Sequence, residues 1–420
     1  MSDYEEDLYQ DVKSRYGAIP QVASGLVGTI RQSKRSAPVS LLNNWIKTVV
    51  ISEAITRTNF DVLDLSGGAG GDLKKWFHAK ARSYVLVDLV DEYVKQAVSR
   101  RRERIRSHSI HLDRMKNPPM TPSAFVVADV ARQSLDKVLP PDCWFDVVSC
   151  QFAAHYFFAS EQTAHQFFEN ASSRLRWGGS FVMTAPNSQY IVKRTRDELK
   201  NNPKGFEPLE EMVRLSGEEL VPGPGFGSNI YGVLFPPETV LKKFGTMYWF
   251  YLADAFGCVR EYLINEKEME RIARSHNLFL ERREPFYQIL DRHYSTGKGD
   301  KNRRKLQEMR VFDPHEPELS HDAWELAHFY AAFTFRKRKP FGTTTVQPQT
   351  PFASLEHLSM YRIVDNQLEK VPEEEIGQGQ KPMALRHEFV YELQEWEQPL
   401  PVDDWKQGFS LEIPEFHYNY

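Results

Sequence analysis

Between residues 60 and 184 the chain alternates short apolar segments with segments of helical spacing, and no other feature constrains its fold as strongly. Strands that alternate with helices form a parallel, doubly wound sheet with right-handed crossovers. Ligands of such a sheet bind outside the carboxyl ends of its strands. We expect five strands, at residues 60–65, 84–88, 124–129, 145–150 and 179–184.

Helical segments precede and separate these strands. The first begins near residue 41, where Leu42, Trp45, Ile46, Val49 and Val50 share one helical face. Beyond residue 187 the alternation ends, and a stretch rich in Gly, Pro and acidic residues predicts a long loop or lid. The further elements that we expect are helices at 72–81, 92–106 and 160–174, the loop at 203–235, a mixed segment at 244–283 and a strand at 329–335.

Composition divides the chain into three parts. Residues 1–35 form a flexible basic arm, residues 36–340 a catalytic domain with lid elements at about 200–290, and residues 341–420 an acidic, Pro-containing extension with a hairpin near 360–371. The extension holds 14 acidic and 5 basic residues, which gives it a charge of −9. Because the whole chain has a net charge of −4, residues 1–340 carry +5. A mildly basic body suits a polyanionic ligand.

The cysteines and the apolar segments exclude several classes of protein. Cys143, Cys150 and Cys258 are odd in number and lack C-x-x-C spacing, which argues against a disulfide framework and a zinc cluster. The acidic start has no apolar core, and no run of about 18 apolar residues reads as membrane-spanning. We therefore expect a soluble intracellular protein without a metal.

A glycine turn follows the first expected strand. It reads Ser66-Gly-Gly-Ala-Gly-Gly71 and is followed by Asp72. Closely spaced glycines let the backbone approach a ligand. A carboxylate at Asp72 disfavours the pyrophosphate of a dinucleotide and suits the cationic sulfonium and amino group of S-adenosylmethionine. The alternative is a tight turn in which Asp72 caps the next helix.

Two further acidic residues end the next strands. Asp88 ends the second strand, where its carboxylate can accept both ribose hydroxyls, and Asp129 ends the third, where it can take the adenine amino group. Either residue alone is more often a turn or cap residue. Together with Asp72 they predict a nucleoside-binding site.

Several segments resemble the eukaryotic messenger-RNA cap guanine-N7 methyltransferases, in that family's order and from about residue 36 to 339. The segments are LLNNWIKTVVI at 41–51, LDLSGGAGGDLKKW at 63–76, CQFAAHYFFAS at 150–160, RLRWGGSFVMTAPNSQYIVKR at 174–194, FGTMYWFYLADAFGCVREYLI at 244–264 and WELAHFYAAFTF at 324–335. The resemblance implies a Rossmann-like class I S-adenosylmethionine-dependent methyltransferase fold with a cap-binding insertion.

The resemblance also implies an activity: transfer of the methyl group of S-adenosylmethionine to guanine N7 of the cap, without a general base and without a metal. It assigns seven residues to the cofactor, namely Lys47 to the methionine carboxylate, Asp72 to its amino group, Asp88 to the ribose, Asp129 to the adenine, Ser66 to the turn, and Gln151 beside Tyr156. It assigns seven to the cap, namely Asn43 and Asn44 at the rim, Lys75 and Arg100 at the triphosphate, and His155, Glu261 and Tyr330 around the guanine. Read singly, Lys75 and Arg100 could be solvated helix faces, and His155 and Tyr330 ordinary core residues.

The turn departs from the family pattern. The family reads Gly-Cys-Gly-Lys-Gly-Gly-Asp, whereas Ser66 replaces its first glycine and Ala69 its lysine. Ser66 is compatible with the turn if its backbone dihedral is ordinary, and Ala69 removes a cation from the cap phosphates. Two alternatives stay open: a weak or silent methyltransferase-fold subunit that stimulates a capping partner, and a methyltransferase for another nucleoside.

Partners and location follow from the resemblance. We expect capped mRNA as substrate, a nuclear location and a monomer, with the capping guanylyltransferase or triphosphatase, or RNA polymerase II, as candidate partners. The acidic extension, with Trp396, Trp405, Phe409 and Tyr418, is a candidate docking segment for the basic body or for such a partner; a solvated tail is the alternative.

Overall fold

The computed structural model describes residues 35–111, 122–255, 257–295, 301–311, 319–344 and 346–377. The basic arm before residue 35 and the aromatic, acidic residues from 378 onward lie outside the described residues. The described residues belong to one compact unit, whose boundary lies at Gln380. Within them, no helix has both the length and the apolar character that crossing a bilayer requires.

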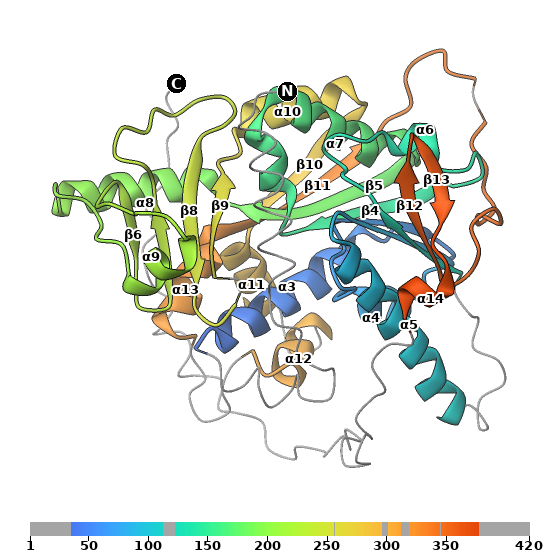
Figure 1. Cartoon of the computed structure of the whole chain (residues 1–420), viewed down its shortest axis with the longest axis horizontal. Coiled ribbons are helices and arrows are strands. Elements are labelled where there is room, and N and C mark those ends of the chain that lie inside the picture. The colour runs from blue at the N-terminus through green and yellow to red at the C-terminus, as the bar shows by residue number, and fades with distance from the viewer. Residues whose placement is uncertain are drawn as a thin grey trace. The chain divides into compact units, whose positions relative to one another are not determined.

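A nine-stranded sheet forms the centre of this unit, in the order β10-β11-β5-β4-β1-β2-β3-β12-β13 (Figure 1). The strands β1 to β5 are parallel, as the alternation predicts, whereas β11 is antiparallel to β5 and β10 to β11. The bounds are β1 Asp61–Leu65, β2 Ser83–Asp88, β3 Ser123–Val127, β4 Phe145–Gln151, β5 Leu175–Pro186, β10 Leu278–Pro285, β11 Tyr330–Lys337, β12 Ser359–Val364 and β13 Gln367–Lys370.

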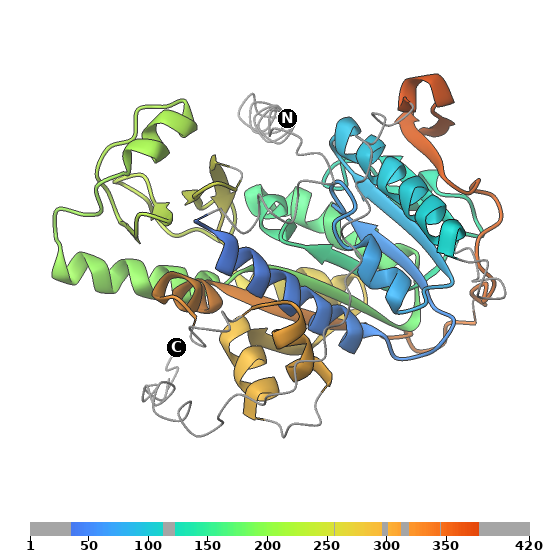
Figure 2. The ribbon, with the colours of Figure 1, turned by 90° about the horizontal axis from the view of Figure 1, so that it is seen from below.

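Helices cover both faces of the sheet (Figures 1 and 2). Successive β1 residues point to opposite faces, since Val62 packs in one apolar cluster and Leu63 in the other. The first cluster contains residues of α3 Ala37–Ala54, α4 Leu73–His78, α5 Asp91–His111, α11 Phe286–Ser295, α12 Lys301–Glu308 and α13 His321–Phe329. The second contains residues of α6 Leu135–Val138, η3 Ala154–Ala159, α7 Glu161–Ser173 and α10 Glu266–Ser275.

The predicted long loop at 203–235 contains regular structure instead. It carries a helix and two strands of a second, four-stranded antiparallel sheet in the order β6-β7-β8-β9. Its glycines suggested a loop, but they allow the backbones of two strands to pack closely. A Cβ on Gly225 or Gly227 would lie within 2.4 Å of a β7 carbonyl oxygen. The elements of this lid are α8 Ser188–Asn201, α9 Glu210–Ser216, β6 Gly225–Gly227, β7 Tyr231–Leu234, β8 Met247–Leu252 and β9 Gly257–Tyr262.

The expected boundary at residue 340 does not end the compact unit. The chain continues from β11 to the opposite edge of the sheet, where β12 pairs in parallel with β3 and turns into β13. The predicted hairpin at 360–371 corresponds to these two strands, and the short helix α14 Glu373–Ile376 follows. Although the segment is rich in polar residues, its apolar side chains pack into the core of the unit, namely Phe352, Leu355, Met360, Tyr361, Val371 and Ile376.

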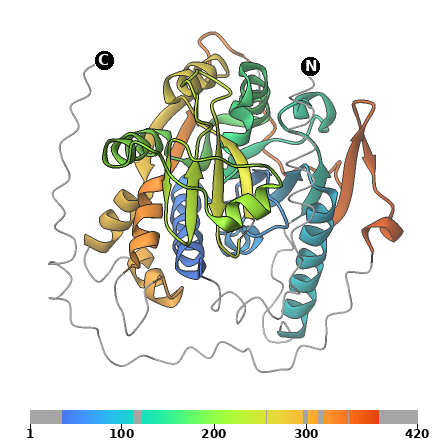
Figure 3. The ribbon, with the colours of Figure 1, turned by 60° about the vertical axis from the view of Figure 1, so that its left-hand side comes forward.

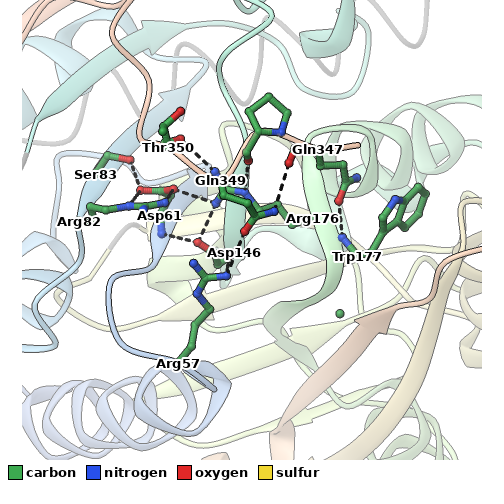
Figure 4. Close-up of polar contacts among 12 residues, drawn as sticks. Arg57, Asp61, Arg82, Ser83, Asp146, Arg176, Trp177, Gln347, Gln349 and Thr350 are labelled. Carbon is green, nitrogen blue, oxygen red and sulfur yellow. Dashed lines mark hydrogen bonds and ion pairs between the residues drawn. The ribbon is translucent and has the colours of Figure 1, made fainter. Parts of the chain in front are cut away.

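A buried ion network lies at the amino ends of the parallel strands (Figure 4). Arg176 Nη1 donates to Asp61 at 2.8 Å and to Asp146 at 2.7 Å, and all three side chains are at most 7% exposed. The same guanidinium donates to the carbonyls of Pro348 at 2.7 Å and Thr350 at 3.3 Å. The network therefore links β1, β4 and β5 to the segment that leads to β12.

Replacement of Arg176 by methionine should lower the free energy of unfolding by about 1.5–3 kcal/mol, because it removes charge-assisted hydrogen bonds to two carboxylates that keep, among the described residues, only Arg82 and Arg57 as cationic partners. Urea denaturation of the full chain measures this change. Lys200→Ala is the matched control, since its ion pair with Asp197 is exposed and should contribute below about 1 kcal/mol. Equal, small effects of the two variants would contradict the structural importance of the network.

Candidate functional site

The glycine turn after β1 is tied to the end of β2 through Asp88. The Gly68 amide donates to Asp88 Oδ2 at 2.8 Å, and the Val90 amide donates to Oδ1 at 2.9 Å. Burial raises the pKa of Asp88 to about 6, although these backbone hydrogen bonds favour its ionised form. A carboxylate has about four acceptor sites, so two oxygens that each accept one amide can still accept the hydroxyls of a ribose.

The glycines of this turn differ in what surrounds them. A Cβ on Gly67 would lie 2.7 Å from Leu86, and one on Gly70 would lie 2.4 Å from Leu73. By contrast, a Cβ on Gly68 or Gly71 would meet no heavy atom of the described chain within 4 Å. The turn thus packs on one side and leaves room for a ligand on the other, as a nucleoside site requires.

Ser66 does not have the ordinary backbone dihedral that we assumed for it. Its φ is 55°, in the left-handed region where a non-glycine residue costs roughly 1–2 kcal/mol. The serine therefore occupies a glycine conformation.

Asp72 lies between two lysines at the start of α4. Lys47 Nζ on α3 lies 2.9 Å from Asp72 Oδ2, and Lys75 Nζ lies 2.7 Å from Oδ1. Lys75 also donates to Asn44 Oδ1 at 2.6 Å. Burial raises the pKa of Asp72, but the two ammonium groups outweigh it and hold that pKa at about 2. Asp72 occupies the N-cap position of α4, as the alternative predicted, but its side chain makes no cap hydrogen bond and pairs with the two lysines instead.

The Lys75 side chain is only 11% exposed, which also excludes the interpretation of a solvated helix face. Burial lowers the pKa of its ammonium group. Arg100 on α5 reaches the same region, where its Nη1 donates to the Ala69 carbonyl at 2.6 Å. Asn43 lies next to Asn44 on α3 and is partly exposed. A guanidinium group thus lies beside the position at which the family lysine is replaced by alanine.

Two predicted cofactor residues, Asp129 and Gln151, follow β3 and end β4. Asp129 Oδ1 accepts the Ala131 amide at 2.9 Å, and Oδ2 lies 3.7 Å from Arg132 Nε. Gln151 accepts the Thr184 hydroxyl at 3.1 Å and donates to the Ser149 hydroxyl at 3.1 Å. Both side chains are therefore oriented by their neighbours at the carboxyl edge of the sheet.

Phe152 links the cofactor side of the site to the cap side, and the sequence did not single it out. Its φ is 60°, its ring lies 5.9 Å from Lys47 Nζ, and its centroid lies 5.1 Å from that of Tyr330. Tyr330 begins β11, is 5% exposed and also stacks on Phe286. Tyr330 is thus a core residue, and it also contacts Phe152 at the edge of the candidate site.

His155, Glu261 and Tyr248 form a buried polar cluster between η3 and the lid. His155 Nε2 lies 3.3 Å from Glu261 Oε1, and the Tyr248 hydroxyl donates to Glu261 Oε2 at 2.6 Å. Neither His155 ring nitrogen has a hydrogen-bond partner among the described residues, and its ring centroid lies 4.1 Å from that of Tyr156. His155 is therefore not a satisfied core histidine. Tyr248 was missed because only strand register shows that it pairs with Glu261.

The strand order and the site together define a class of protein. Parallel strands in the order β3-β2-β1-β4-β5, the antiparallel β11 beside β5, the glycine turn after β1 and the acidic residue at the end of β2 make this a Rossmann-like class I S-adenosylmethionine-dependent methyltransferase. A solved S-adenosylmethionine-dependent methyltransferase from Clostridium acetobutylicum ATCC 824 is similar, with a TM-score of 0.39 and 14% identity over 75% of this chain and 96% of that chain.

Sequence comparison gives the particular family. The mRNA (guanine-N(7))-methyltransferase domain matches residues 2–207 and 208–338. The chain is 31% identical to "mRNA cap guanine-N(7) methyltransferase 1" of Oryza sativa subsp. japonica over 74% of this chain and 78% of that protein. It is 31% identical to the Schizosaccharomyces pombe (strain 972 / ATCC 24843) mRNA cap guanine-N(7) methyltransferase over 78% and 82%, and 29% identical to the Caenorhabditis elegans enzyme over 78% and 87%. The chain belongs to the mRNA (guanine-N7)-methyltransferase family.

The raised pKa of Asp88 predicts how binding of S-adenosylmethionine changes with pH. Below about pH 6 the carboxyl group of Asp88 is protonated and loses the charge that favours hydroxyl donors, so affinity should fall as the pH drops through 6 and stay constant above it. Titration calorimetry between pH 5 and 8 measures this profile.

The Asp88→Asn variant should bind more weakly than wild type above about pH 6 and approach the wild-type affinity near pH 5, so that its own profile is flat. Asp64 is the control, because burial and the neighbouring Asp72 raise its pKa to about 7. If the pH dependence disappears in Asp64→Asn and persists in Asp88→Asn, the titrating group is Asp64, and the prediction for Asp88 is wrong.

Proposed function

We propose that this chain transfers the methyl group of S-adenosylmethionine to guanine N7 of the mRNA cap. Family membership supports the reaction. The observation that carries the site is the buried His155–Glu261–Tyr248 cluster, which joins η3, just after the carboxyl end of β4, to the lid strands β8 and β9 and can supply acceptors and donors to a purine edge.

On the cofactor side, the described residues suit the groups of S-adenosylmethionine. Lys47 has three ammonium donors and one contact to Asp72, so it can also donate to the methionine carboxylate. Asp72 stays ionised and can accept from the amino group, Asp88 from the ribose and Asp129 from the adenine. S-adenosylmethionine supplies a methyl group on a positively charged sulfur, and S-adenosylhomocysteine remains as product.

On the cap side, the chain has to position guanine and does not have to remove a proton. Guanine N7 has a free lone pair, so a bond forms from N7 to the methyl carbon as the carbon–sulfur bond breaks. The positive charge passes to the purine ring. Glu261 stabilises that ring by accepting from its N1–H and 2-amino edge, and His155 and Tyr330 border it. Rate enhancement then comes from alignment and electrostatics.

Different observations support the proposed enzyme and its two alternatives, the silent subunit and the methyltransferase for another nucleoside. The left-handed Ser66 and the missing lysine at Ala69 favour a weak or silent subunit that stimulates a capping partner. The guanidinium of Arg100 beside Ala69 and the Asp88 contacts favour an active enzyme. A methyltransferase for another nucleoside would use Asp88 and Asp129 without needing Glu261.

The biological setting is part of the proposal. We infer that the substrate is capped mRNA, that the protein acts in the nucleus as a monomer, and that it works beside the capping guanylyltransferase or triphosphatase, or RNA polymerase II. The names of its relatives support the substrate.

The Glu261→Gln variant tests this function. Loss of the carboxylate charge should reduce kcat/KM for GpppN-capped RNA by roughly 10- to 100-fold, because a charge-assisted hydrogen bond contributes about 1.5–3 kcal/mol. Binding of S-adenosylmethionine should survive. Methyl transfer from labelled S-adenosylmethionine measures the rate.

Glu325→Gln is the matched control for this variant, since Glu325 also accepts a tyrosine hydroxyl, that of Tyr190 at 3.2 Å, outside the proposed site. Unchanged cap methylation by Glu261→Gln would remove this residue from the mechanism. Wild-type protein that binds S-adenosylmethionine and leaves capped RNA unmethylated would favour the other-substrate alternative.

Arg100 should contribute to binding of the cap phosphates in place of the family lysine. Arg100→Ala should raise KM for capped RNA by roughly 10- to 100-fold and reduce its salt dependence, whereas Ala69→Lys in the same background should restore much of the loss. Lys74→Ala is the control, because Lys74 is an exposed lysine beside Lys75. A Lys74→Ala effect as large as that of Arg100→Ala would indicate general charge attraction.

A further inference from the structure

The segment at 346–377 lies outside the matched family domain, which ends at residue 338, and yet it contacts the elements that form the cofactor site. It is anchored first at the amino ends of the strands. Besides the two carbonyls that Arg176 binds, the Trp177 amide donates to Gln347 Oε1 at 2.7 Å, and Asp142 Oδ2 accepts the amides of Ala353 and Ser354. The strands β12 and β13 therefore begin from a fixed point.

Strand register places one β12 residue beside the end of β2. Asp88 on β2 pairs with Val127 on β3, and Val127 pairs with Arg362 on β12. The three residues thus form one row across neighbouring strands, and Arg362 lies at the carboxyl edge, where the cofactor residues lie. Figure 3 shows the β12–β13 hairpin (red) beside α5 (teal).

Arg362 contacts the first residue of α5. Its Nε donates to Asp91 Oδ1 at 2.7 Å, and its Nη1 donates to Glu375 at 2.6 Å. Burial of Asp91 disfavours its charge, but the hydrogen bonds from Arg362 and Lys95 outweigh this and lower the pKa of Asp91. Asp91 directly follows Val90, whose amide holds Asp88.

A second contact holds α5 further along the helix, at Arg102. Arg102 Nη2 donates to Glu373 at 2.8 Å and to the Leu358 carbonyl at 3.2 Å. The same helix carries Arg100, which donates to the Ala69 carbonyl of the glycine turn. The hairpin and α14 thus contact α5 at two points, while α5 contacts the turn.

We propose that Arg362 is a positioning residue for the nucleoside side of the site. It acts through Asp91: the ion pair fixes the start of α5 and with it the Val90 amide, which orients the Asp88 carboxylate toward the ribose. The C-terminal hairpin is therefore a functional part of the catalytic domain. This inference rests on the proposed function only in taking Asp88 as the ribose acceptor.

The test is calorimetric titration of full-length variants with S-adenosylmethionine. Arg362→Gln should weaken binding about threefold to tenfold, because groups in one hydrogen-bond network are energetically coupled. In turnover assays KM for S-adenosylmethionine should rise while kcat at saturation is kept. Arg362→Lys should recover part of the affinity. Lys370→Gln is the control, because its ion pair with Glu356 lies in the same hairpin and does not touch α5.

A second variant separates positioning from loss of folding. Asp91→Ala removes the acceptor without altering the hairpin, and it should weaken binding as Arg362→Gln does, while the double variant should be no weaker than Asp91→Ala alone. Wild-type affinity in Arg362→Gln, or additive effects in the double variant, would overturn the inference. Wild-type protein that does not bind S-adenosylmethionine would refute the proposed site itself.

Discussion

The hydrogen bond from the Gly68 amide to Asp88 is the contact on which the arrangement of the site depends. It joins the turn after β1 to the end of β2 at 2.8 Å, and the Gly67 amide adds a hydrogen bond to the Val87 carbonyl at 3.1 Å, so the turn and the proposed ribose acceptor are held together. It is possible because parallel pairing places the carboxyl ends of β1 and β2 side by side. The next contacts extend from this edge: Lys47 and Lys75 pair with Asp72, and Lys47 also lies over the ring of Phe152.

Electrostatics differ between the two ends of the sheet. At the amino ends, Arg176 neutralises Asp61 and Asp146 in a network that also binds the C-terminal segment. At the carboxyl ends, the compensation is uneven: Asp72 has two ammonium partners, whereas Asp88 accepts backbone amides only, within the described part of the chain. The first arrangement suits a structural anchor, and the second suits charged ligand groups.

Much of the geometry at the carboxyl edge was predictable because residues such as Asp88 and Asp129 sit at recognisable places in the strand and helix pattern. The ends of β2 and β3 and the glycine turn follow from alternation, which is a local property, and the structure places the predicted residues at one edge. Other features were not predictable. The lid strand β6 was taken for a loop because its glycines, which permit close strand contact, are also the residues of turns. Tyr248 and Phe152 required strand register and a left-handed backbone that no local pattern shows.

The amino-acid sequence by itself determined the order of strands and helices, the acidic residues at the strand ends and the similarity to cap methyltransferases, because periodicity and motifs depend on neighbours along the chain. Only the tertiary structure decided which charges pair, that Ser66 adopts a glycine conformation, and that residues 346–377 complete the sheet and contact α5. These depend on groups far apart in the sequence, such as Arg362 and Asp91, whose contact arises only when β12 pairs with β3.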